Sequence, residues 1–196
     1  MIIVLACMVG GFALLSYAPE KTVAHLALHP RGVLSGKLWQ LLSYSLVNSG
    51  CGLIFNAAIV LFFGSAIERE WHTRSFLILW AVVSLVCGLI WMAVSLAGGW
   101  ELVGLGSSAC AYGIIGAFGL LYRRRRFFAL VWTVEAQVLA LLLIAIGVVL
   151  SIPSPITLIW VAGAAVAYLY VRLLWHLKTG ARQQDPPKRG PFVEID

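Results

Sequence analysis

The feature that most constrains this chain is a set of long apolar runs without any charged residue. Five such runs cover residues 1–19, 38–67, 75–100, 102–122 and 136–171. Hydrophobic residues make up 61% of the chain and charged residues only 11%, too few polar side chains to cover a water-soluble globule of 196 residues. Because a helix needs about 20 mostly apolar residues to cross a bilayer, the runs predict an all-α, polytopic membrane protein.

Six helices follow from these runs. Four of them are read directly: Ile2–Ala18, Gly50–Ile67, Phe76–Ala97 and Ser107–Tyr122. The stretch from Phe127 to Trp175 is too long for one span, and Pro153 and Pro155 divide it. We therefore expect a fifth helix over roughly Phe127–Leu150 and a sixth over roughly Ser154–His176.

The rest of the chain divides into loops and a tail. Residues 1–178 form the predicted six-helix membrane domain. The tail at 179–196 is rich in Pro, Gly, Gln and charge, and a disordered cytoplasmic segment is expected there. The segment at 19–49 contains short amphipathic stretches, and we expect it to pack at the membrane interface.

Basic residues gather on one side of the predicted bundle. Eleven of the 14 lysines and arginines fall on the side of the termini, and only Lys21, Arg31 and Lys37 fall on the other. By the positive-inside rule both termini are cytoplasmic, and the four arginines at 123–126 anchor the topology. The net charge of +6 therefore needs no nucleic-acid partner. We expect a multi-pass protein of a bacterial plasma membrane, in contact with lipid.

No motif for a metal, nucleotide or organic cofactor is present. The four cysteines lie in or beside apolar runs without the spacing of a zinc site or a disulfide framework.

The fourth span combines hydroxyls with small residues. It begins Gly104-Leu105-Gly106-Ser107-Ser108, and Ala109, Gly113 and Ala117 then recur every four residues. Such a face lets a neighbouring backbone approach closely. Because Gly163 and Ala167 form a similar face on the sixth helix, the two helices are predicted to pack tightly, with Ser108 in an enclosed pocket.

In this region the chain resembles the rhomboid family of intramembrane serine proteases, whose fourth helix begins G-x-S-G and continues with an aromatic residue and G-x-x-G-A. The similarity extends in order from about Gly36 to Ala167. It includes Gly36-Lys37-Leu38-Trp39-Gln40-Leu41-Leu42-Ser43, Phe55-Asn56, Phe62-Phe63-Gly64, Ile67-Glu68, Arg74-Ser75-Phe76-Leu77, Tyr112-Gly113-Ile114-Ile115-Gly116-Ala117 and Trp160-Val161-Ala162-Gly163.

The resemblance implies a catalytic serine at Ser108 and a base at position 160, where the family carries histidine. Here that residue is Trp160, whose indole nitrogen is a donor without a basic lone pair. A serine hydroxyl is a poor nucleophile without a neighbouring base. Gly106, Tyr112 and Gly163 match the supporting positions of the motifs, while Ala109 replaces the final motif glycine.

One of the two hydrogen-bond donors that the resemblance implies for the oxyanion hole is also missing. In the family, histidine and asparagine four residues apart supply two donors; here the pair is Gly52 and Asn56, and an earlier histidine position is Val47. Asn56 could equally serve as a hydrogen-bonding contact between helices.

The other histidines and Glu135 are expected to lie far from Ser108, so they are poor candidates for its base. His72 and His176 belong to the cytoplasmic side, whereas His25 and His29 could reach Ser108 only if their loop folded over the site. Glu135, placed within the fifth helix, is a functional candidate as an intramembrane acid, but we expect it to pair with the arginines at 123–126.

The expected function is therefore that of a pseudoprotease, which binds the transmembrane segments of other proteins without cleaving them. The alternative is an active intramembrane serine endopeptidase; a small transporter or channel is disfavoured by the sparse intramembrane charge. The oligomeric state is left open by the sequence.

Overall fold

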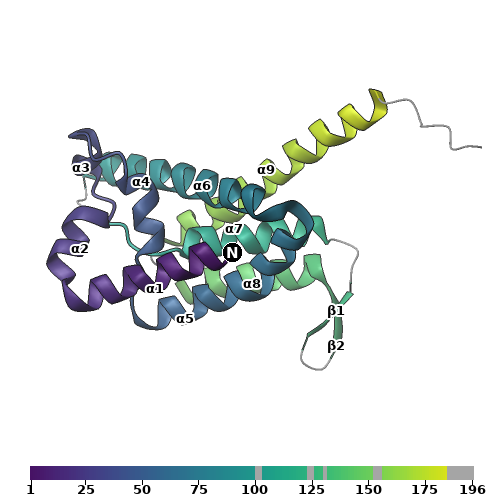
Figure 1. The fold of residues 1–196 in the computed structure, drawn as a ribbon, viewed down its shortest axis with the longest axis horizontal. Helices are drawn as coiled ribbons and strands as arrows, with labels where there is room; N and C mark the ends of the chain where they lie inside the picture. Colours follow the sequence, from purple (N-terminus) through teal and green to yellow (C-terminus); the bar gives the residue numbers. More distant parts are fainter. Residues whose placement is uncertain (100–102, 123–125, 130–131, 152–155, 185–196) are drawn as a thin grey trace, which may run out of the picture.

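The computed structural model describes residues 1–99, 103–122, 126–129, 132–151 and 156–184, and these form a mainly helical bundle (Figure 1). Its longer helices are α1 (Ile2–Tyr17), α5 (Gly50–Ile59), α6 (Ser65–Ala97), α7 (Ser108–Leu121), α8 (Ala136–Ser151) and α9 (Ile156–Gln184). The structure confirms the helical character of the chain. α7 lies in the middle of the bundle, in contact with α5, α6, α8 and α9.

The second and third predicted spans form one helical stretch with a break. A π-helical turn, η2 (Val60–Gly64), joins α5 to α6, and His72 interrupts α6 with φ of 66° and ψ of 156°. Figure 1 shows α5 and the labelled part of α6 on opposite sides of α7. This stretch, Gly50–Ala97, is long and apolar enough to cross a membrane; the other apolar helical segments of the described chain are shorter, at 10–17 residues.

Hydrogen bonds connect the part of this stretch between η2 and His72 to the first residue, Met1. Glu68 accepts hydrogen bonds from the Met1 ammonium at 2.8 Å and from the Thr73 hydroxyl at 2.7 Å. These bonds lower the pKa of the Glu68 carboxyl, with the ammonium as the larger cause. The ionised carboxylate thus links α1 to the beginning of α6.

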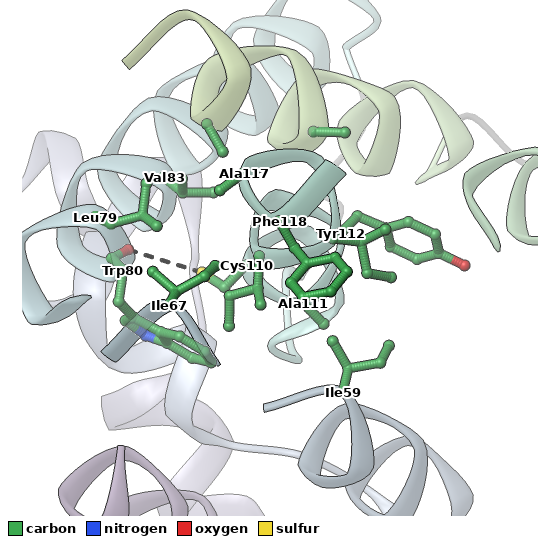
Figure 2. Close-up of a cluster of buried hydrophobic side chains, with 14 of the residues drawn as sticks. Ile59, Ile67, Leu79, Trp80, Val83, Cys110, Ala111, Tyr112, Ala117 and Phe118 are labelled. Atoms are coloured by element: carbon green, nitrogen blue, oxygen red, sulfur yellow. Dashed lines mark hydrogen bonds between the residues drawn. The ribbon is translucent and has the colours of Figure 1, made fainter. Parts of the chain in front are cut away.

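The tightest packing joins α7 to α9, as the small-residue faces predicted. A Cβ atom at Gly163 would collide with the carbonyl oxygen of Ala109, and one at Gly116 would lie 2.7 Å from the carbonyl oxygen of Ala164. Around α7, the buried core includes Trp80 and Val83 of α6, and Figure 2 shows Tyr112 projecting from α7 on the side away from Trp80. At these two points the backbones of α7 and α9 therefore meet with only glycine and alanine between them.

The prediction of a fifth helix beginning near Phe127 was wrong. The chain first forms an antiparallel hairpin from β1 (Arg126–Ala129) and β2 (Trp132–Glu135), and α8 begins only at Ala136. Aromatic and β-branched residues dominate this segment and favour strands. Apart from this short hairpin, the elements of the described residues are helical, as the all-α prediction expected.

The predicted location of Glu135 within the fifth helix was consequently wrong. It is exposed at the end of β2 rather than enclosed within a membrane helix. Its Cα is paired in register with that of Arg126. The expected pairing with the other three arginines, at 123–125, lies outside the described residues.

The 19–49 segment folds into short helices, two of which pack on α6. They are α2 (Pro19–Leu26), α3 (Pro30–Leu34), α4 (Gln40–Ser43) and the 3-10 helix η1 (Tyr44–Leu46). The Gln40 side chain is fully buried and accepts a hydrogen bond from the His29 backbone N–H at 3.2 Å. The Tyr44 hydroxyl donates to the Ser84 carbonyl oxygen at 3.0 Å, and burial raises the pKa of this phenol, so it remains a donor.

The last helix differs from its predicted bounds. α9 begins at Ile156 and continues to Gln184, so the residues from 179 to 184, predicted as disordered, are helical. The remainder of the predicted tail, 185–196, lies outside the described residues.

Replacing Gly163 by alanine should destabilise the bundle. The added methyl would collide with the backbone of α7, and overpacking of this kind costs about 1–3 kcal/mol. The free energy of unfolding, measured by denaturant titration in mild detergent, should fall accordingly. Gly10→Ala is the matched control, because nothing lies within 4 Å of a Cβ at Gly10; equal effects of the two variants would contradict the packing described above.

Candidate functional site

The site lies where α7 begins, and the segment before α7 is held in place by backbone hydrogen bonds. Leu28 and Gly104 exchange two of them, each 2.9 Å long, and the Gly106 N–H donates to the Tyr44 carbonyl oxygen at 3.1 Å. Gly106 has φ of 111°, a conformation that side-chain-bearing residues rarely adopt. The glycine therefore permits the turn that delivers Ser107 and Ser108 to the start of α7.

Asn48 organises this turn. Its Oδ1 atom accepts hydrogen bonds from the Ser107 backbone N–H at 3.0 Å, from the Ser107 hydroxyl at 2.9 Å and from Asn56 Nδ2 at 3.1 Å. Asn48, Ser107 and Asn56 are all buried. A single amide oxygen thus joins the segment before α5, the α5 helix and the start of α7.

Ser108 takes part in the same network. Asn56 Nδ2 donates a hydrogen bond to Ser108 Oγ at 3.3 Å. Among the described side chains, no histidine hydrogen-bonds to Ser108, and the ring of His29 instead lies with its Nε2 3.0 Å from the Val23 carbonyl oxygen. The oxygen of Ser108 therefore receives a hydrogen bond, while no described imidazole is placed to remove its proton.

Trp160 lies beside Ser108 and is fixed by an aromatic stack. Its ring and that of Tyr112 are nearly parallel, with centroids 5.3 Å apart and an interplanar angle of 11°. The Tyr112 hydroxyl reaches α8, where a Cβ atom at Gly147 would collide with it. Tyr112 thus connects α7 with both α8 and α9.

A cavity of about 130 Å³ adjoins these residues. Ser108, Ala109, Ile159 and Trp160 form part of its wall. The other lining residues are Tyr44, Trp91, Val103, Gly104, Leu105 and Gly106. All ten lining residues are uncharged.

The structure therefore brings Ser108, Asn56, Trp160, Tyr112 and Gly106 together, with Gly163 behind Ala109 in the α7–α9 contact. Gly52 stands apart: it is exposed, and nothing lies within 4 Å of a Cβ built on it. His25 and His72 are exposed, and the side chain of His176 lies outside the described residues. Val47, at another position implied for histidine, is buried.

Sequence reasoning missed Asn48. This residue stands eight positions before Asn56 in a short polar stretch, Asn48-Ser49, between two apolar segments. That stretch was the available signal, but its proximity to Ser107 depends on how the 19–49 segment folds. The network leaves Asn48 Nδ2 and Asn56 Oδ1 buried without a hydrogen-bond partner among the described residues.

In the described part of the chain, apolar helices thus surround a buried polar network at the start of α7. The chain belongs to the DUF1751 family, described as eukaryotic integral membrane proteins, whose model matches residues 1–187. No curated protein matches the chain at a significant level.

Asn48→Ala should destabilise the start of α7. The Ser107 backbone N–H and hydroxyl would lose their common acceptor, and a buried donor without a partner costs about 1–3 kcal/mol. Asn48→Asp keeps the accepting oxygens and should lose less stability. Thermal unfolding in detergent compares the two variants, and an alanine variant at least as stable as the aspartate variant would exclude this role for Asn48.

Proposed function

We propose that this protein is a rhomboid-like pseudoprotease, which holds transmembrane segments of other membrane proteins without cleaving them. The observation that carries the proposal is the environment of Ser108. Trp160 lines the same cavity, in the position where the resemblance implies a base, and Asn56 donates a hydrogen bond to the serine oxygen.

This environment opposes nucleophilic attack. A serine attacks a carbonyl only when a base accepts its proton, and Trp160 has no lone pair for that purpose. The hydrogen bond from Asn56 draws electron density from the serine oxygen, which makes the hydroxyl a better donor and a poorer nucleophile. Both effects favour binding over hydrolysis.

The proposed topology has six membrane-spanning segments with both termini in the cytoplasm. It rests on the four shorter apolar helical segments and on the break at His72, which divides Gly50–Ala97 into two spans. The distribution of basic residues supports the orientation. A bacterial plasma membrane stays a prediction from the sequence, and the family match concerns proteins described as eukaryotic.

A client helix would approach the site from the bilayer. Ile54 and Phe62 are 73% and 76% exposed on the helical segments that follow Asn48, and apolar side chains at such positions face lipid or another helix. Leu105, at the cavity wall, is 41% exposed and would meet a segment held there. The partner class proposed is therefore a transmembrane helix.

Two measurements test the absence of catalysis. Ser108 should not be labelled by a fluorophosphonate, and purified protein reconstituted with a transmembrane reporter should leave the reporter uncut. Ser108→Ala should behave as the wild type in both assays. Cleavage that disappears in Ser108→Ala would establish the endopeptidase instead.

Photo-crosslinking tests the binding. A benzophenone amino acid at Leu105 should crosslink to the reconstituted reporter helix, whereas the same probe at Tyr17, which is 93% exposed on α1, should not. Trp160→Ala should weaken the Leu105 crosslink at least several-fold, because it removes a wall of the cavity. Equal crosslinking from Leu105 and Tyr17 would contradict a specific site.

A further inference from the structure

The cavity beside Ser108 is uncharged, and this limits the client side chains that it can hold. Its volume is about 130 Å³, and none of its lining residues is basic or acidic. A charged group without a partner is costly to bury in such surroundings. A client side chain that enters the cavity is therefore expected to be neutral.

The Ser108 hydroxyl is available as a donor at the cavity wall. Asn56 Nδ2 donates to Ser108 Oγ at 3.3 Å and to Asn48 Oδ1 at 3.1 Å, so the serine oxygen already accepts one hydrogen bond. In the described part of the chain, the Ser108 hydroxyl donates to none of the groups of this network. An acceptor that enters the cavity can therefore take this proton in a hydrogen bond.

A backbone acceptor belongs to the same wall. Leu28 and Gly104 exchange two hydrogen bonds in an antiparallel bridge, each 2.9 Å long. In such a bridge the next residue directs its polar groups away from the partner strand, so the C=O of Leu105 points away from Leu28. Leu105 lines the cavity, and its carbonyl accepts no backbone hydrogen bond from the described residues. The wall thus offers a carbonyl oxygen as well as the serine donor.

A transmembrane helix needs a particular side chain to bond with both groups. Its backbone carbonyl oxygens already accept from N–H groups one turn further along the helix. Serine and threonine hydroxyls in helices commonly bond back to their own backbone. A carboxamide, in contrast, carries an accepting oxygen and a donating NH2 group on one neutral side chain.

We infer that the cavity selects client helices that carry asparagine or glutamine, whose carboxamide accepts the Ser108 proton and donates to the Leu105 carbonyl oxygen. The apolar side chains of Ile159 and Trp160 in the same wall suit the methylene groups of such a residue. Ser108 is then the residue that determines which clients are held. This inference rests on the proposed function, because it names the feature by which a bound client is recognised.

Two reporter helices test the inference. Both are leucine-based transmembrane peptides with photo-leucine beside one guest position in the outer third of the helix. The guest is glutamine in one peptide and methionine, which has a similar length and shape, in the other. Crosslinking to the reconstituted protein is titrated with each peptide. The glutamine reporter should show an apparent affinity at least about threefold higher, as expected of one hydrogen bond between membrane helices.

Ser108→Ala should abolish this preference, so that the two reporters bind equally. Ser35→Ala is the matched control, because its hydroxyl is exposed and donates to the Gly32 carbonyl oxygen at 2.8 Å, within the 19–49 segment. This control should keep the preference of the wild type. Crosslinking to the methionine reporter monitors the folded state of each variant.

The outcomes separate the inference from the proposed function. Equal affinities of the two reporters for the wild type, or a preference that persists in Ser108→Ala, would overturn the recognition of a carboxamide while the binding of clients stands. Saturable crosslinking to neither reporter would contradict the proposed function, and the inference would fall with it.

Discussion

The close approach of α7 and α9 is the contact on which the site depends. The carbonyl oxygen of Ala109 occupies the space that a side chain at position 163 would need, so the two backbones meet directly. This contact places Ser108 of α7 and Trp160 of α9, which are far apart in the sequence, on the wall of one cavity. Within a membrane, where lipid is as apolar as the side chains, such van der Waals packing is a main source of helix association.

The polar network at the start of α7 complements this packing. Asn48 supplies one acceptor for donors from two separate segments, and Asn56 passes the network on to Ser108. In the dry surroundings of a membrane protein each of these bonds is costly to leave unmade. The same network that orders the serine also directs a donor toward its oxygen, and the indole of Trp160 offers no compensating base. In the proposed function, the network that orders the hydroxyl therefore also makes it a poorer nucleophile.

The sequence by itself determined the helical membrane character and the small-residue faces that join α7 to α9. Both follow from composition and from the period of the α-helix, which act within single segments. Only the tertiary structure decided the hairpin at Arg126–Glu135, the role of Asn48 and the cavity beside Ser108. Whether an apolar segment becomes strand or helix, and which distant polar group meets Ser107, depends on contacts between segments far apart in the chain. The aromatic and β-branched residues around Phe127 favour a strand, but the apolar stretch that follows them was assigned with them to one helix. Asn48 was passed over because local pattern carries no record of contacts between distant segments.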